Sequence, residues 1–444
     1  MKPGIQLVAI LTLFAVIPGC TDSANGTIAK AATATAAAGG QPAGSQPAGS
    51  QPLPSSSAVD SASGSTTETV EFVAAPLTDA EVREGWISLF DGRSLFGWDV
   101  PKSTNWHVEE DAIVADSGEK SLLLTPFALD DFELRCDFHL AAGGNSGLFL
   151  RTADNASNPA TDTYELNICD SHSTHKTGSL VGRFVAEKIS SVEGSWHNFR
   201  VVCEGPRIQV WLDGNPIVDF TDSSDAVRLT GKLGLQMNQG RAAYRKICVR
   251  PLRFQPLLNG TDTTGWRIVP GSKSEFTVED NLLHVSNGPG FLETEKTFGN
   301  FAVKVEARIN GEGLNSGVFF RAKPGTESAP SHGYEMQLHN GVKGHDRSKP
   351  ADFGTGAIFR RVPARYVVSN DREFFTAVLI AQGDRFLSWV NGYQVVNWQD
   401  TRKPSDNPRE GRRLNAGHIS LQGHDPTTNL DFRSIEIHPF LAPL

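Results

Sequence analysis

The sequence lacks several features that would point to common functions. It has no run of Lys and Arg, and its formal net charge is −9, which argues against nucleic acid as a partner. It has no Cys-x-x-Cys pair, which argues against a zinc site built from thiolates. The apolar run from Ile5 to Ile17 is shorter than the roughly 20 residues that span a membrane. No long segment carries the apolar stripe of a helix, so we expect a fold built from strands.

The amino terminus has the layout of an export signal. Lys2 precedes the apolar run, and small residues lead to Cys20 directly after Gly19. This resembles a bacterial lipobox, in which Cys20 is lipidated and becomes the first residue of the mature protein. A plain secretory signal with a chance cysteine is the alternative. We expect residues 1–20 to be a signal peptide, and the mature lipoprotein to lie in the periplasm or cell envelope, in contact with the membrane through its anchor alone.

The next segment, residues 21–77, has the composition of a linker. It consists largely of Ala, Gly, Ser, Thr, Gln and Pro. Such a segment buries too little apolar surface to offset the entropy of ordering. It is predicted to be a disordered tether that leads to globular domains.

The remainder of the chain contains one unit twice. The stretch Asn145–Arg151 recurs 170 positions later as Asn315–Arg321. Further matches lie 178 positions apart at Thr177 and Thr355, and 186 positions apart at Gln236 and Gln422. Each step of 8 positions falls in a polar, Gly- and Pro-rich stretch, which indicates longer loops in the second copy. We expect domains at residues 78–252 and 253–444, because a repeat of this length is a complete domain.

Both copies have the sequence pattern of antiparallel sheets. Apolar and polar residues alternate from Phe132 to Leu140 and again from Phe301 to Ile309, as in half-buried strands. Asp213-Gly214 and Asn391-Gly392 predict tight hairpins. Residues 78–84 could form one short helix. The fold class predicted is all-β, with two tandem concanavalin-like β-sandwiches, or jelly rolls.

The cysteines after Cys20 all lie in the first copy. Cys136 and Cys203 fall in alternating strands, where the second copy has Val305 and Ala381. This favours buried small side chains over a shared bridge, although four cysteines allow three pairings.

Two strands that recur in both copies carry the candidate chemistry. In the first strand, Phe149 and Arg151, like Phe319 and Arg321, would share a face and could stack on a sugar and clamp its hydroxyls. A core phenylalanine and a structural arginine is the competing interpretation. In the second strand, polar residues alternate with apolar ones, which suits the wall of a cleft or a solvent face. These polar residues are Glu165, Asn167 and Cys169 in copy one and Glu335, Gln337 and His339 in copy two.

The combined motifs resemble a known family. Leu-Phe-Asp-Gly…Gly-Trp, Asn-Ser-Gly-x-Phe-x-Arg, Tyr-Glu-x-x-Ile, Thr-Gly and Gly-Leu-Gln occur in this order, fully or in part, in both copies. They resemble the family named for 3-keto-disaccharide hydrolase and 3-keto-glucoside 1,2-lyase/hydratase activity, which has a lectin and glucanase fold. The resemblance implies cleavage at C1 of glycosides whose C3 hydroxyl has been oxidised to a ketone, with help from a divalent metal in some cases.

The chemistry suits these residue types. A ketone at C3 acidifies the C2 proton, so one base and one group that stabilises an enolate are enough. Ordinary glucanases need two carboxylates, and neither copy has the Glu-x-Asp-x-x-Glu pattern that supplies them. Direct hydrolysis of an unoxidised glycoside is therefore the weaker interpretation.

The second copy is the stronger candidate for activity on sequence alone. It has His424 after Gln422, where the family has a histidine, whereas the first copy has Asn238. The predicted catalytic residues are Glu335, His424, His339 and Arg321, with His339 and His424 as candidate ligands of a divalent metal. The predicted substrate-binding residues are Asn315, Ser316, Phe319, Gln337, Gln422, Arg151, Glu165 and Asn167. The alternative function is a tandem carbohydrate-binding, lectin-like protein without turnover.

Overall fold

The computed structural model describes residues 77–187 and 189–441. The predicted signal peptide, Cys20 and the linker up to residue 76 lie outside these residues. No helix in the described part of the chain is long and apolar enough to cross a bilayer. The short helix expected near residue 80 is α1 (Asp79–Glu84). Thr78 and Glu81 cap its first turn, each side chain accepting the other's backbone N–H.

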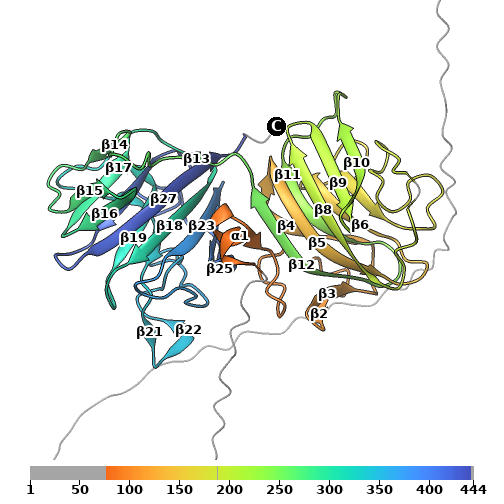
Figure 1. Ribbon diagram of the computed structural model, residues 1–444, viewed down its shortest axis with the longest axis horizontal. Coiled ribbons are helices and arrows are strands. Elements are labelled where there is room, and N and C mark those ends of the chain that lie inside the picture. The colour runs from red at the N-terminus through yellow and green to blue at the C-terminus, as the bar shows by residue number, and fades with distance from the viewer. Residues whose placement is uncertain (1–76, 188, 442–444) are drawn as a thin grey trace, which may run out of the picture. The chain divides into compact units, whose positions relative to one another are not determined.

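The first sandwich consists of two antiparallel sheets (Figure 1, orange to green). The larger sheet has the order β10 (Asn215–Thr221), β9 (Arg207–Leu212), β8 (Trp196–Glu204), β5 (Phe132–Leu140), β12 (Ala242–Pro251), β3 (Ala112–Ala115) and β2 (His107–Glu109), and β1 (Ile87–Ser88) pairs with β12. The smaller sheet has the order β4 (Ser121–Leu129), β11 (Gly231–Met237), β6 (Ser146–Thr152) and β7 (Tyr164–Ile168).

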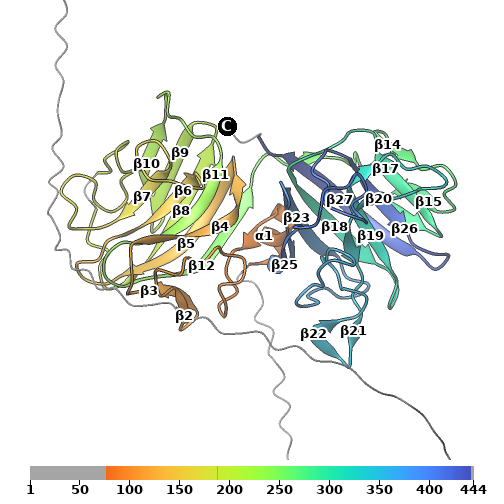
Figure 2. The same cartoon turned by 180° about the vertical axis from the view of Figure 1, so that it is seen from behind.

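The second sandwich repeats this plan (Figure 2, green to blue). Its larger sheet has the order β15 (Glu275–Glu279), β16 (Leu282–Ser286), β27 (Asn429–Pro439), β18 (Phe301–Ile309), β23 (Phe375–Gln382), β24 (Arg385–Val390) and β25 (Tyr393–Gln399), and β13 (Gln255–Pro256) pairs with β27. The other sheet has the order β14 (Trp266–Ile268), β17 (Gly290–Thr294), β26 (His418–Gly423), β19 (Ser316–Lys323) and β20 (His332–Leu338). A hairpin of β21 (Val342–Lys343) and β22 (Asp346–Pro350) lies in the first insertion. The prediction of two all-β sandwiches is confirmed.

The local predictions follow from strand geometry. Alternate residues of β5, such as Phe132, Leu134 and Phe138, enter the apolar core of the first sandwich. Both predicted hairpins form with two-residue turns. Asp213 and Gly214 have φ values of 49° and 79°, and Asn391-Gly392 repeats this with 48° and 77°. Positive φ at both positions is the turn that matches the twist of the flanking strands.

The cysteines of the described chain are unpaired. Cys136, Cys169, Cys203 and Cys248 are free and buried. Burial raises the pKa of Cys203 and of Cys248 to about 12, so both remain neutral thiols. The interpretation of Cys136 and Cys203 as small core residues is confirmed.

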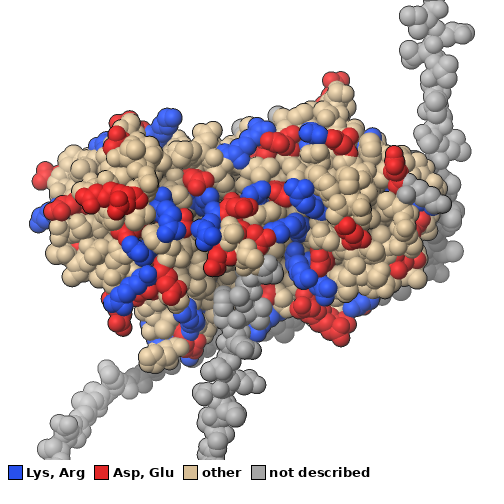
Figure 3. Space-filling view, viewed as in Figure 1, with Lys and Arg blue, Asp and Glu red and all other residues tan. Residues whose placement is uncertain are grey.

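The two sandwiches make direct contacts. Trp389 of β24, in the second sandwich, is fully buried and packs into the apolar core of the first sandwich. Its indole N–H donates to the Ser88 carbonyl at 2.8 Å. An ion pair joins Arg365 to Asp91, and a hydrogen bond joins His438 Nε2 to Asp130 Oδ1, both at 2.6 Å. The surface seen in Figure 3 carries acidic and basic side chains interspersed with one another.

One buried arginine occupies the same place in each sandwich. The Arg151 guanidinium donates to the carbonyls of Asp130, Gly205 and Arg228. Arg321 donates to the equivalent carbonyls of Gly299, Gly383 and Arg413. Both arginines are fully buried. Each one therefore joins three chain segments from both sheets of its sandwich.

A β-bulge turns these arginines inward. Four residues of β19, from Phe319 to Ala322, oppose three residues of β26, and Arg321 has a φ of 48°. Arg151 has a φ of 49° at the matching bulge of β6. The expectation that each arginine shares a face with the phenylalanine two residues earlier is wrong, because the bulge breaks the period of two.

We expect Arg321→Met to destabilise the second sandwich by about 3–5 kcal/mol, because several buried carbonyls lose their donor. Urea unfolding measures this change. Arg372→Met, at an exposed position of the same sandwich, is the control and should leave the midpoint almost unchanged. Equal midpoints for the two variants would contradict a structural role for Arg321.

Candidate functional site

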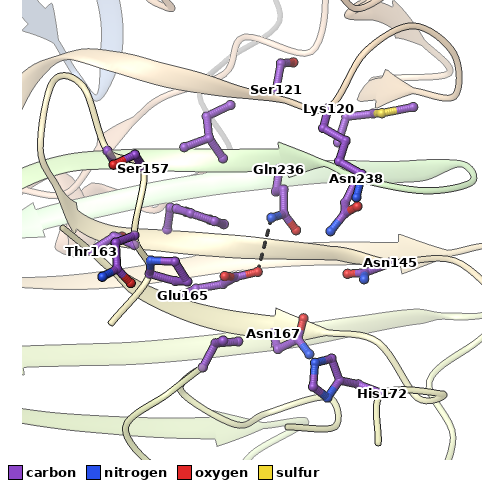
Figure 4. Close-up of a pocket in the computed structure, with 17 residues that line it drawn as sticks. Lys120, Ser121, Asn145, Ser157, Thr163, Glu165, Asn167, His172, Gln236 and Asn238 are labelled. Atoms are coloured by element: carbon purple, nitrogen blue, oxygen red, sulfur yellow. Dashed lines mark hydrogen bonds between the residues drawn. The ribbon is translucent and has the colours of Figure 1, made fainter. Parts of the chain in front are cut away.

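The first sandwich holds a cavity of about 580 Å³ on the outer face of its smaller sheet. Leu148 and Leu150 of β6 enter the core, so Phe149 between them lies on the opposite face and lines the cavity. Polar side chains surround it, as Figure 4 shows. Those most useful for binding a sugar are Lys120, Ser121, Asn145, Glu165, Asn167, His172, Gln236 and Asn238. An apolar floor with convergent polar groups is typical of a site for a small ligand.

Glu165 is the buried carboxylate of this cavity. It lies on β7 opposite Phe149 of β6, and Gln236 of β11 donates its amide N–H to Glu165 Oε1 at 3.1 Å (Figure 4). Burial raises the pKa of Glu165, and the hydrogen bond from Gln236 acts in the opposite direction. A carboxylate with a raised pKa is a better proton acceptor than an exposed one.

Two amide oxygens near Glu165 have no hydrogen-bond partner. Gln236 Oε1 and Asn145 Oδ1 are buried and unpaired. Asn167, in contrast, is fixed, because its amide donates to the carbonyl of His175. Buried polar atoms without partners are costly, and hydroxyl groups of a bound ligand would satisfy them.

The matching region of the second sandwich is occupied by its own chain. Asp352, in the first insertion, accepts hydrogen bonds from Asn315 at 2.5 Å and from Gln337 at 2.9 Å. These amides correspond to Asn145 and Asn167 of the first sandwich. The insertion therefore satisfies groups that a ligand would otherwise contact.

A smaller cavity of about 250 Å³ lies beside Glu335. Glu335 is on β20 opposite Phe319, and Gly317 leaves room for it: a Cβ there would lie 2.7 Å from Glu335 Oε1. Burial raises the pKa of Glu335 to about 7, and the negative charge of Asp352 adds to this. Arg409 and Arg360 act in the opposite direction, because their positive charges favour the ionised carboxylate.

The family described as the 3-keto-alpha-glucoside-1,2-lyase-like domain matches residues 85–250 and again residues 253–438. The chain belongs to this family. The tandem arrangement predicted from the sequence is confirmed. Membership supports a carbohydrate-active function and a glycoside-acting enzyme, with a sugar as its substrate. No curated protein matches the chain.

Several solved structures each align with about two fifths of this chain. A provisionally named glycosyl hydrolase from Parabacteroides distasonis is 21% identical, aligns over 40% of this chain and 99% of its own, and has a TM-score of 0.36. A second such protein from the same organism is 22% identical, aligns over 38% of this chain and 99% of its own, and has a TM-score of 0.34. The carbohydrate-binding module CBM66 from Bacillus subtilis is 18% identical, aligns over 37% of this chain and 95% of its own, and has a TM-score of 0.26.

The structure corrects four predicted roles in the family motif. Arg321 and Arg151 are fully buried and bonded to carbonyls, so neither reaches a substrate as an enolate or hydroxyl clamp. Ser316 is also fully buried, and its hydroxyl donates to the Gln422 carbonyl. Phe319 is covered by Phe291 and Arg409, so it offers no open face to a sugar.

The two predicted metal ligands do not belong to a metal site. His339 Nδ1 accepts the Gly341 amide, and the exposed His424 pairs with Asp425 at 2.8 Å. Neither histidine lines the cavity beside Glu335. No group of three or more His, Cys, Asp or Glu side chains in residues 77–187 and 189–441 is arranged to hold a metal. The donor set therefore does not fit the divalent metal that the family resemblance implies.

Several residues at these cavities were not found from the sequence. In the first sandwich they include Lys120 and Asn145. Asn145 could have been found, because it is equivalent to Asn315. In the second sandwich, Arg360 and Arg409 were missed, and the arginine-rich stretch after Pro408 was the available signal.

We expect the stability of the protein to depend on pH through Glu335. Its folded pKa of about 7 lies above the ordinary value, so stability is lost as the pH rises from about 4.5 to 7. Glu335→Gln removes this loss, which amounts to at most about 3 kcal/mol above pH 7. The variant should therefore melt at a higher temperature relative to the parent at pH 8 than at pH 5. Glu312→Gln, at an exposed position, is the control. A gap in melting temperature that does not change with pH would contradict the raised pKa.

Proposed function

We propose that this protein cleaves 3-keto-glycosides or 3-keto-disaccharides at C1, and that the cavity of the first sandwich holds the sugar. The observation that carries this assignment is the buried Glu165 in a cavity of about 580 Å³ lined with polar groups. The sequence alone favours the second sandwich, with Glu335, His339 and His424 as candidates for the base. The available space favours the first, because Asp352 of the first insertion binds the matching amides of the second.

The reaction uses few groups. Glu165 accepts the proton from C2, and the electron pair of that C–H bond forms the enolate of the C3 ketone. The enolate then expels the C1 substituent, which takes up a proton as it leaves. Lys120 lines the same cavity and supplies a positive charge for the developing oxyanion. Water added across the resulting double bond gives the product of net hydrolysis.

Glu165→Gln should lower kcat on a 3-keto-glucoside by about 100-fold or more, because the amide cannot accept the C2 proton. Mass spectrometry of the products measures this, with 3-keto-trehalose and unoxidised trehalose as paired substrates. Glu204→Gln, at an exposed glutamate of the same sandwich, is the control. We expect cleavage of the keto sugar alone.

Three other outcomes would change the assignment. Loss of turnover in Glu335→Gln, with Glu165→Gln unaffected, would move the reaction to the second sandwich. Cleavage of unoxidised trehalose would remove the keto requirement. Binding of the keto sugar without any product would leave the tandem carbohydrate-binding protein as the function.

Export and lipidation at Cys20 complete the proposal. The support is the charged start, the apolar run and the Gly19-Cys20 junction. Cells that express the protein should incorporate radiolabelled palmitate into it, and globomycin should block its processing. Cys20→Ser should abolish the label. Label retained in this variant would overturn the anchor.

A further inference from the structure

The cavity beside Glu335 differs in charge from the one beside Glu165. Three arginines line it: Arg360 and Arg361 from the segment between β22 and β23, and Arg409 from the second insertion. In the described residues, no carboxylate oxygen lies within 4.0 Å of a guanidinium nitrogen of these three arginines. Other arginines near the same insertion are paired, Arg402 with Asp400 at 2.7 Å and Arg412 with Asp384 at 3.1 Å. The unpaired cations therefore gather at the cavity.

Comparison of the two sandwiches shows that this pairing differs between them. In the first, Arg183 forms an ion pair with Asp222, which also accepts the Tyr164 hydroxyl. The equivalents in the second sandwich are Arg361 and Asp400, 178 positions later, and Tyr334, 170 positions later. Tyr334 still donates to Asp400, at 2.7 Å, but the carboxylate now pairs with Arg402. Arg361 is consequently left with backbone carbonyls as its partners.

The two sandwiches also differ at the neighbouring position. Gly182 of the first sandwich has a φ of 72°, and Arg360 occupies the equivalent position with a φ of 58°. A left-handed backbone favours glycine, so an arginine there is held at a cost. Its guanidinium lies 5.3 Å from the Phe359 ring centroid, and it is exposed at the cavity. The second sandwich thus has an added cation where the first has no side chain.

Arg409 completes the arrangement. It lies over the Phe319 ring, with 5.6 Å between the guanidinium and the ring centroid, and donates to Ser331 Oγ at 3.1 Å. These two contacts fix its position and leave the rest of its donors available. Guanidinium groups bind carboxylate and phosphate oxygens through paired N–H donors.

We propose that the cavity lined by Arg360, Arg361 and Arg409 binds a sugar that carries an oxyanion, either a carboxylate or a phosphate. Its volume, about 250 Å³, is below the roughly 300–1,000 Å³ of pockets for drug-sized ligands and suits one sugar ring. This goes beyond the cleavage proposed for the first sandwich and does not depend on it. The second sandwich would thereby hold charged saccharides beside the first.

Isothermal titration calorimetry of the purified chain tests this, with D-glucuronate, D-glucose 6-phosphate, D-glucose and inorganic phosphate as probes. We expect one or both anionic sugars to bind at least about tenfold more tightly than D-glucose, and 1 M NaCl to weaken them. The affinities for D-glucuronate and D-glucose 6-phosphate show whether the cavity prefers a carboxylate or a phosphate. Since the readout is binding, it is independent of turnover at Glu165.

Variants locate the site. Arg409→Gln and Arg360→Gln should each weaken the anionic sugar at least about tenfold, and Arg409→Lys should weaken it less. Arg372→Gln, an exposed arginine of the same sandwich away from the cavity, should bind as the parent does. Melting temperatures establish that each variant is folded. Three results would overturn the proposal: equal affinity for D-glucose, affinity unchanged in both cavity variants, or inorganic phosphate bound as tightly as the sugars.

Discussion

The fold depends on a guanidinium buried at the same place in each sandwich. Arg151 and Arg321 each satisfy three backbone carbonyls from segments that lie far apart in the sequence. Those segments lead into strands of both sheets, so each arginine fixes how the two sheets meet at one end. Burial lowers the pKa of Arg321 to about 10, which still leaves it charged at neutral pH. In each sandwich, one arginine therefore offsets the cost of burying the three backbone carbonyls to which it donates.

The same constraint shapes the ligand face. The bulge that turns Arg151 inward begins directly after Phe149, which stays on the outer face of the sheet. Glu165 is paired with Phe149 across the strands, so the motif that stabilises the sandwich also sets the floor of the cavity. The second sandwich keeps this scaffold with Phe319 and Glu335 and changes only the loops above it. Function can diverge between the copies because the fixed part and the variable part are separate.

Much of the fold could be predicted from local sequence patterns. The strand from Phe132 to Leu140, the turn at Asp213-Gly214 and the two-copy organisation all follow from periodicity and turn chemistry. The roles of Arg151 and Arg321 were not accessible in this way, because one bulged residue reverses the face of a side chain. Glu165 and Asn167, which the alternation predicted to face either a cleft or solvent, line the cavity of the first sandwich. His424 was favoured by its alignment, but an alignment does not show that its partner is Asp425 at an exposed turn. The offsets between the copies showed where the insertions lie. The cavity beside Glu335 could not be predicted, because it depends on packing between residues that are far apart in the sequence.

The different groups around Glu165 and Glu335 explain why these two glutamates should have different functions. Glu165 has a neutral amide as its partner, so a substrate that enters its cavity meets a proton acceptor and hydroxyl-binding groups. No hydrogen bond to the Glu335 carboxylate is found in the described chain, and Arg409 and Arg360 are the cations that act on it. An anion between those arginines would raise the pKa of Glu335 further, because it would weaken the attraction that favours the carboxylate. Ligand binding there would keep Glu335 protonated, and a protonated carboxyl group donates a hydrogen bond where a carboxylate would repel the anion. The buried acid of the second sandwich is therefore better suited to hold a charged saccharide than to remove a proton from it.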